Sequence, residues 1–307
     1  MGEPVATRGF FIRQRWLLLR RTSQLGLLGL FLLGPWFDIW WVKGNLAASD
    51  WFDLVPLEDP FIALQSLLAT HHMTRTALLG SAIIGVFYAL VGGRVYCSWV
   101  CPVNVITDAA HWCRERLHLP PGWRPQRALR WWLVGMSLVV SAVTGGIAWE
   151  LVNPVTMVQR GLVFGLGLAW AIVAAIFLFD VLVSRRGWCG HLCPVGAFYG
   201  LLGRRSVIRI AAHTREACTD CGDCFAVCPE PHVITPALRG SGGDTRLVLS
   251  GDCTNCGRCI DVCADDVFKF TLRPGYTGDS PAASKALPPL VSKHRLTVRH
   301  ARDPDHG

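Results

Sequence analysis

The chain has 307 residues, of which 51% are hydrophobic and only 17% are charged. That balance is too apolar for an ordinary soluble domain, so membrane-spanning segments are the first expectation. The formal net charge is +8, but the arginines flank apolar stretches and the sequence carries no nucleic-acid motif. The basic charge therefore indicates membrane topology rather than a nucleic-acid partner.

Four apolar stretches are predicted to cross a bilayer as helices, because a span needs roughly 20 residues. They are Thr22–Trp41, Ala77–Gly93, Trp131–Glu150 and Leu162–Ser184. Basic residues gather before the first stretch, between the second and third, and after the fourth. The positive-inside rule then predicts a multi-pass protein of the bacterial inner membrane with both termini in the cytoplasm. Residues 1–21 form the basic N-terminus in this interpretation, and residues 22–205 form the transmembrane domain.

Two segments of this region, 92 residues apart, share the pattern aromatic-C-x3-C-P-V. The first holds Cys97 and Cys101, and the second holds Cys189 and Cys193. The repeat predicts two tandem helical hairpins, and a spacing of four places each pair one helical turn apart. Each pair is a candidate for metal ligands or redox thiols, and small buried thiols that merely pack are the alternative. Repetition at matching positions favours a function, whereas Cys113 stands alone and is expected to be structural.

From Cys218 onward the sequence contains two successive runs of the form C-x2-C-x2-C-x3-C. This is the pattern of bacterial two-cluster ferredoxins, in which the fourth cysteine of each run ligates the other cluster. Two [4Fe–4S] clusters are therefore expected in this part of the chain. The expected ligands are Cys218, Cys221, Cys224 and Cys263 for one cluster, and Cys253, Cys256, Cys259 and Cys228 for the other.

Zinc and disulfides are the competing interpretations of these eight cysteines. Zinc sites use four ligands, and the two runs supply too many cysteines too close together. Disulfides are disfavoured in the reducing cytoplasm, where the predicted topology places this region. The predicted fold is thus an all-α membrane bundle of four transmembrane helices in two tandem hairpins, followed by a small α+β two-cluster ferredoxin-like domain at 206–272. Residues 273–307 lack periodicity and are expected to be a disordered tail.

The motifs together resemble the NapH-type membrane ferredoxin, the quinol dehydrogenase subunit of the periplasmic nitrate reductase system. The segments that carry the resemblance are Gly92–Pro102, Trp149–Pro154, Arg185–Pro194 and Cys253–Cys259. The resemblance implies an electron-transfer component that passes electrons from quinol toward periplasmic nitrate reductase, rather than a complete enzyme. It also implies two partners, a periplasmic polyferredoxin and a membrane-anchored multihaem cytochrome.

Oxidation of a quinol releases two electrons and two protons, so a proton acceptor is needed near the quinol. Ionisable residues within or at the ends of apolar stretches are the default candidates, here His72, Glu150 and Asp38. A neutral imidazole or a carboxylate can accept a proton near neutral pH. The competing function is an iron–sulfur redox sensor or a maturation factor for a respiratory enzyme, and a sensor is expected to carry an additional output domain.

Overall fold

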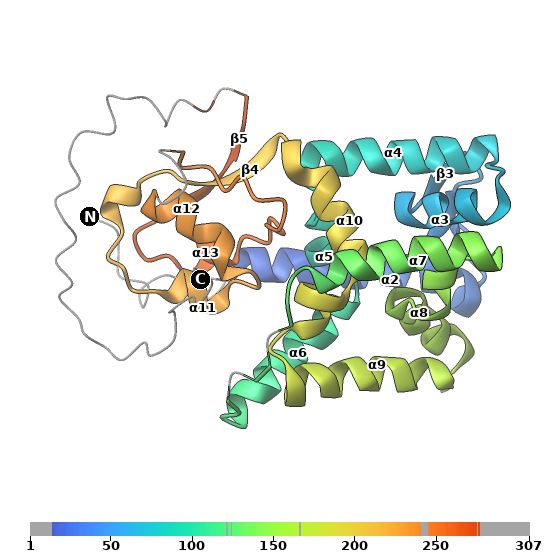
Figure 1. Cartoon of the computed structure of the whole chain (residues 1–307), viewed down its shortest axis with the longest axis horizontal. Coiled ribbons are helices and arrows are strands. Elements are labelled where there is room, and N and C mark those ends of the chain that lie inside the picture. The colour runs from blue at the N-terminus through green and yellow to red at the C-terminus, as the bar shows by residue number, and fades with distance from the viewer. Residues whose placement is uncertain are drawn as a thin grey trace.

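The structure is a computed structural model that describes residues 14–120, 122–123, 125–165, 167–240, 245–274 and 276. A helical part and a cysteine-rich part lie next to each other along the long axis of the molecule (Figure 1). The start of the predicted basic N-terminus, 1–13, and most of the predicted tail, 277–307, lie outside the described residues.

Four apolar helices extend along the long axis of the helical part (Figure 1). They are α2 (Arg15–Phe37), α4 (Arg75–Val91), α7 (Leu129–Thr144) and α9 (Leu168–Leu178). Shorter helical elements connect or follow them. The 3-10 turn η2 (Ala148–Leu151) and α8 (Pro154–Phe164) lie between α7 and α9, the π-helical turn η3 (Phe179–Val183) directly follows α9, and the 3-10 turn η5 (Gly203–Arg205) lies farther along the chain.

The expectation of a four-helix transmembrane bundle is wrong. Among the described residues only α2 is both long and apolar enough to cross a membrane, and the other apolar helices have 10–17 residues. Glycines explain the difference, because a residue with positive φ ends a helix wherever the hydropathy continues. Gly145 (φ +70°) ends α7, and Gly165 (φ +88°) separates α8 from α9 within the fourth apolar stretch. Helix α4 has only 17 residues because the second apolar stretch is itself short.

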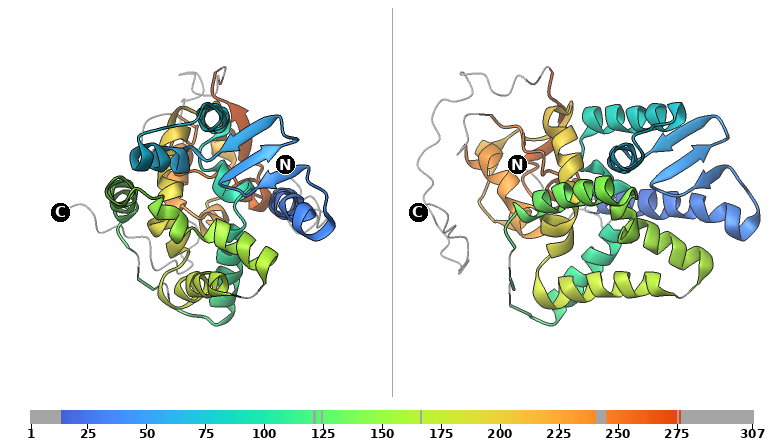
Figure 2. Two further views of the ribbon diagram at one scale, coloured as in Figure 1. Left: turned by 90° about the vertical axis from the view of Figure 1, so that its right-hand side faces the viewer. Right: turned by 45° about the vertical axis from the view of Figure 1, so that its right-hand side comes forward.

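The helical part is also not all-α. After α2 the chain forms an antiparallel sheet of three short strands, β1 (Val42–Gly44), β2 (Ala48–Trp51) and β3 (Val55–Glu58), in the order β1-β2-β3. The sheet lies at the end of the molecule away from the cysteine-rich part (Figure 2). Helix α3 (Pro60–Thr70) follows, and its N-cap residue Asp59 accepts a hydrogen bond from the backbone N–H of Phe61 at 2.8 Å.

The two C-x3-C-P segments have similar local structures. Each follows an apolar helix with a short helical turn, α5 (Val95–Trp99) after α4 and the π-helical η4 (Trp188–Leu192) after α9 and η3. The proline then stands at the start of the next helix, α6 (Val103–Arg116) or α10 (Pro194–Leu202). This use of proline follows from its fixed φ and its missing N–H, which suit a helix start.

Glycines let the two repeats pack backbone against backbone. A Cβ added at Gly93 would lie 1.5 Å from the carbonyl oxygen of Tyr199, and one added at Gly203 would lie 2.2 Å from the backbone nitrogen of Gly93. Beside this contact the rings of Tyr96 and Tyr199 stack, with centroids 5.0 Å apart. The first cysteine pair is thereby held against α10, which begins directly after Cys193 of the second pair.

The cysteine-rich part is built on a two-stranded antiparallel sheet. Strand β4 (Ile208–Ala212) pairs with β5 (Phe268–Leu272), with Ile208 opposite Leu272. The segment between them holds α11 (Asp223–Val227), α12 (Ile234–Arg239) and α13 (Arg258–Val262), with the 3-10 turns η6 (Arg215–Ala217) and η7 (Pro231–Val233). Its hydrophobic core includes Cys224 and Cys259, so part of each cysteine run faces inward.

Candidate functional site

The two cysteine runs follow the same backbone path. Gly222 (φ +83°) caps the start of α11 and Gly257 (φ +73°) caps the start of α13, each directly after the second cysteine of its run. Asp220 and Asn255, two residues after the first cysteine, also have positive φ. These left-handed positions turn the chain sharply between successive cysteines, which lets the side chains of each run converge.

One cavity of about 410 Å³, the distal cavity, is lined by three cysteines of the first run and the last of the second. They are Cys218, Cys221, Cys224 and Cys263. The backbone N–H of Asp220 donates to Sγ of Cys218 at 3.5 Å, and that of Val267 donates to Sγ of Cys263 at 3.4 Å. Hydrogen bonds to ligand sulfurs are among the contacts that set the reduction potential of an iron–sulfur cluster.

A second cavity of about 380 Å³, the proximal cavity, contains the other four cysteines of the two runs. They are Cys253, Cys256, Cys259 and Cys228. Burial opposes ionisation of Cys256, yet the guanidinium groups of Arg258 and Arg20 lower the pKa of this thiol below its usual value. Positive charge therefore favours the thiolate form at Cys256, whereas burial raises the pKa of the other three thiols, Cys228, Cys253 and Cys259.

Arg20 is a sign that the surroundings of Cys256, at the edge of the proximal cavity, suit an anionic group. This residue of α2 is fully buried, and neither Nη1 nor Nη2 has a hydrogen-bond partner in the protein. A buried cation without a partner is strongly destabilising, so its neighbourhood is expected to supply negative charge. A cluster held by four thiolates beside Cys256 meets that requirement, and the donor set suits it.

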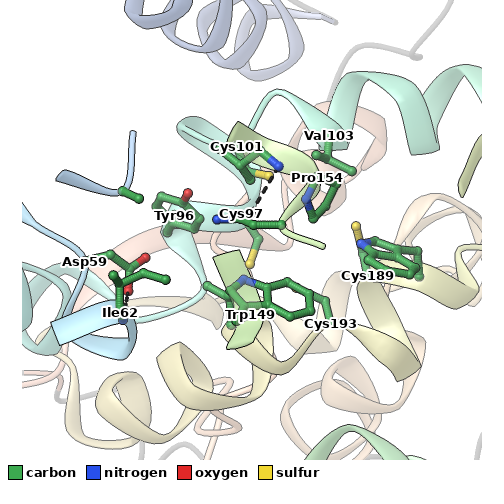
Figure 3. A pocket seen from close by; sticks show the side chains of 15 residues that line it. Asp59, Ile62, Tyr96, Cys97, Cys101, Val103, Trp149, Pro154, Cys189 and Cys193 are labelled. Atoms are coloured by element: carbon green, nitrogen blue, oxygen red, sulfur yellow. Dashed lines mark hydrogen bonds between the residues drawn. The ribbon is translucent and has the colours of Figure 1, made fainter. Parts of the chain in front are cut away.

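A third cavity, the repeat cavity, has a volume of about 590 Å³ and lies between the two C-x3-C-P segments. Cys97 and Cys101 reach it from the first repeat, and Cys189 and Cys193 from the second (Figure 3). Cys101 lies beyond the end of α5, so the first pair does not occupy one continuous helix as the spacing predicted. The rest of the wall is largely apolar, with Trp149 among its members.

Asp59 is the carboxylate that lines the repeat cavity, and the sequence analysis did not single it out. Its residue is only 7% exposed, and burial raises the pKa of its carboxyl group to about 6. An aspartate before proline at the start of an apolar helix is typical of an N-cap, so the sequence pattern indicates only that structural role. Its position at the cavity wall depends on the packing of α3 against α7, which no local pattern reveals.

A connecting cavity of about 420 Å³ joins the repeat cavity to the proximal cavity. Cys97 and Cys189 line both it and the repeat cavity, whereas Cys256 and Thr254 line both it and the proximal cavity. The distal and proximal cavities are in turn next to each other, because Cys224 and Cys259 belong to one packed core. All cysteines except Cys113 thus fall into three groups of four, which follow one another in the order repeat, proximal and distal cavity.

Buried ion pairs join the helical part to the cysteine-rich part next to these cavities. Arg94, 2% exposed, is 3.0 Å from Glu230, and Arg130 is 2.7 Å from Asp252. Asp108 of α6 pairs with three arginines from distant segments, Arg21, Arg186 and Arg258. Burial opposes ionisation of Asp108, but these guanidinium groups, Arg258 above all, hold the pKa of its carboxyl group well below the usual range.

The three quinol candidates do not come together. Asp38 and His72 are exposed, and Asp38 accepts a hydrogen bond from Nε1 of Trp40 at 2.6 Å. Glu150 is half-buried and accepts a hydrogen bond from Nδ2 of Asn153 at 3.1 Å. Within the described ranges no hydrogen bond or ion pair joins any two of these three candidates, and none of them lines the four cavities above.

Two protein families match the chain. A family described as a 4Fe-4S binding domain matches residues 74–120 and 166–211, so that each match contains one C-x3-C-P segment. A family described as a 4Fe-4S dicluster domain matches residues 210–264, which contain both cysteine runs. No solved structure matches the chain significantly.

Several curated proteins are similar over most of their length. The methylamine utilization ferredoxin-type protein MauN of Methylorubrum extorquens is 54% identical, over 89% of this chain and 94% of that protein. MauN of Paracoccus denitrificans is 53% identical, over 81% of this chain and 88% of that protein. The ferredoxin-type protein NapH of Escherichia coli is 49% identical, over 88% of this chain and 94% of that protein. The resemblance to NapH is confirmed, and the chain belongs to the NapH and MauN family of ferredoxin-type iron–sulfur electron-transfer proteins.

Proposed function

We propose that the cysteine-rich part holds two [4Fe–4S] clusters and that the chain uses them to pass electrons from quinol to a redox partner. Each cluster supplies a site that accepts and releases one electron, so two clusters accommodate the two electrons of a quinol. The distal quartet is Cys218, Cys221, Cys224 and Cys263, and the proximal quartet is Cys253, Cys256, Cys259 and Cys228. The observation that carries the proposal is the lining of two adjacent cavities by one quartet each.

The surroundings of the two quartets differ in charge, hydrogen bonding and exposure, which influence the reduction potentials of the clusters. Buried arginines, Arg20 and Arg258, place positive charge beside the proximal quartet and stabilise its more negative, reduced state. The distal quartet instead has two backbone N–H donors on its sulfurs and includes the exposed Cys221. Access at Cys221 suits exchange of electrons with a partner, while the proximal quartet faces the helical part.

Nitrate reductase in the periplasm is the acceptor system that we propose first, reached through a polyferredoxin and a multihaem cytochrome. The support is the 49% identity to NapH together with the residues that carry the resemblance. A second candidate is electron transfer in methylamine utilization, because two MauN proteins are 54% and 53% identical to the chain. Both candidates use the same clusters and differ only in the partner.

We also propose association with the bacterial inner membrane, and its support is α2, the one described helix that is long and apolar enough to cross a membrane. The N-terminal end of α2 packs against the cysteine-rich part: Trp16 lies 4.7 Å from Phe270, and its backbone N–H donates to Asp261 at 3.4 Å. Arginines precede and begin this helix. The positive-inside rule therefore favours a cytoplasmic position for the N-terminus and for the clusters.

Reduction by quinol tests this function. The full chain is purified without oxygen in detergent, mixed with its partners and quinol, and frozen for EPR spectroscopy, with dithionite as the positive control. The proposal predicts [4Fe–4S]⁺ signals with quinol as well as with dithionite. Signals with dithionite alone would reject quinol as the reductant and favour a sensor or maturation factor. The absence of cluster signals with either reductant would reject the clusters themselves.

Glu150 is the proton acceptor that we propose among the three sequence candidates, because it alone is half-buried. Its carboxylate lies 3.7 Å from Nη2 of Arg160, and its Oε1 is buried without a hydrogen-bond partner. Replacing Glu150 by Gln should slow reduction by quinol while leaving reduction by dithionite unchanged. The matched control, His72→Gln, changes an exposed residue and should leave both rates unchanged.

A further inference from the structure

The repeat cavity brings together four cysteines that the two ferredoxin quartets leave unused. Two come from each repeat: Cys97 and Cys101 at α5, and Cys189 and Cys193 at η4 and the start of α10. All four are free thiols facing one space (Figure 3). Each matched 4Fe-4S segment contributes only one such pair, so neither repeat completes a four-thiolate site by itself. Together the two repeats supply the four thiols that one such site needs.

We propose that these four cysteines hold a third [4Fe–4S] cluster, shared between the repeats, which relays electrons between the helical part and the proximal cluster. The inference rests on the proposed electron-transfer function and adds a site to it. In its redox step, quinol would give its two electrons one at a time to this cluster. The cluster would pass the first electron on to the proximal cluster before it accepts the second, and quinol would become quinone with release of its two protons.

The size of the cavity and the spacing of the thiols favour a cluster over a single ion. One zinc ion needs its sulfur ligands about 2.3 Å from a common centre. Within the described part of the chain, no three histidine, cysteine or acidic side chains lie close enough for that. The two ferredoxin quartets line cavities of about 380 and 410 Å³. By the same measure the repeat cavity, at about 590 Å³, is larger than either of them.

Arg94 provides a second, independent indication of an anionic occupant. Its Nη2 donates to the carbonyl oxygen of Cys189 at 3.0 Å and its Nη1 to Glu230 at 3.0 Å, but its buried Nε has no partner. A methyl group added at Gly196 would lie 3.8 Å from Sγ of Cys97 and 3.9 Å from this Nε, so both atoms face the same glycine. The guanidinium group of Arg94 also interacts with the thiol of Cys97. A buried cationic N–H beside a thiol suits a cluster sulfur as acceptor.

The connecting cavity gives the third cluster its place in the electron path. Cys97 and Cys189 line it on the side of the repeats, and Cys256 lines it on the side of the proximal quartet. A cluster in the repeat cavity would thus be the next carrier after the proximal cluster. Electrons would pass in the order repeat, proximal and distal, or in reverse.

Iron and acid-labile sulfide in the full chain, purified without oxygen, test the proposal directly. The wild type should contain about twelve iron and twelve sulfide per chain, four of each for every cubane. The variants Cys97→Ser and Cys193→Ser, one from each repeat, should each lose one third of the iron and one third of the sulfide. The control Cys113→Ser should retain all of its iron and sulfide. The EPR signals of the two ferredoxin clusters serve as the folding control and should be unchanged in every variant.

A wild-type content of about eight iron and eight sulfide would overturn the third cluster without any variant. So would zinc that disappears in Cys97→Ser while sulfide is unchanged. Both results leave the two-cluster function standing, since that function fails only if quinol reduces no cluster. Different losses for Cys97→Ser and Cys193→Ser would show separate sites in the two repeats and would contradict a shared one.

Discussion

Cys228 belongs to the first run in sequence but lines the cavity of the second. We therefore expect Cys228→Ser to remove the proximal cluster and to leave the distal cluster in place. Cys218→Ser should do the opposite. EPR of the dithionite-reduced variants separates the two, because each should lose the signal of a different ferredoxin cluster. If Cys228→Ser and Cys218→Ser lost the same signal, the fourth cysteines would not be exchanged between the runs.

Arg20 places a guanidinium group beside Cys256, and neither its Nη1 nor its Nη2 has a hydrogen-bond partner in the protein. Arg20→Met removes the charge but keeps most of the side-chain length. We expect the proximal cluster to become harder to reduce, so that its potential shifts to a more negative value, because net charge near a cluster tunes its potential. An EPR-monitored redox titration measures the shift. Arg15→Met, at an exposed position in the same helix, is the control, and an equal shift in both variants would remove the specific role of Arg20.

Helix α6 is joined to α2, to the segment before η4 and to α13 through a single carboxylate, Asp108. Asp108→Asn should lower the free energy of unfolding by about 3 kcal/mol, since breaking a buried charge network leaves its cations uncompensated. Anaerobic thermal unfolding followed by circular dichroism measures the loss. Asp53→Asn, which breaks an exposed pair with Lys43, should change little. Equal effects of both substitutions would contradict a structural role for Asp108.

The lowered pKa of Asp108 also predicts how this contribution depends on pH. A carboxyl group whose pKa is depressed on folding stabilises the fold above its unfolded pKa of about 3.9, and this stabilisation is lost as the pH falls toward the folded value. The wild type should therefore lose stability below about pH 4 faster than Asp108→Asn does. If the free energy of unfolding fell with pH in the same way in both proteins, Asp108 would not contribute this pH-dependent stabilisation.

The contact between the two repeats depends on glycine at the end of α4. Gly93→Ala would place a Cβ against the carbonyl oxygen of Tyr199, so we expect destabilisation of at least 1–3 kcal/mol, about the cost of overpacking. Gly26→Ala in α2 meets no neighbouring atom and should be neutral or slightly stabilising, since alanine favours helix. Thermal unfolding of the two variants distinguishes the positions. A Gly93→Ala protein as stable as Gly26→Ala would contradict the close packing of the repeats.

At the scale of the whole molecule, local spacing was a better guide than hydropathy. The spacing of the two runs predicts two cysteine quartets, and the structure lines one cavity with each, although cluster binding itself stays a prediction. Hydropathy predicted four membrane spans and was wrong, because it counts apolar residues but not the glycines that end helices, such as Gly145 and Gly165. The sheet β1–β3 was missed for a related reason, since its short strands lie where no apolar periodicity marks them.

The residues that surround the cavities could not be predicted from local patterns. Arg20 and Cys256 are far apart in the sequence, as are Asp108 and Arg258, and only the packing of α2, α6 and α13 brings them together. An arginine at the start of an apolar helix indicates membrane topology, which is how the sequence analysis interpreted Arg20. Its burial beside a thiol is a property of the whole molecule.

Metal and sulfide analysis of the anaerobically purified full chain tests the central claim that cysteine quartets enclose iron–sulfur clusters. The account predicts iron and acid-labile sulfide in equal amounts, at least about eight of each per chain, with [4Fe–4S]⁺ EPR signals after reduction. Protein that contains zinc and no acid-labile sulfide would contradict it.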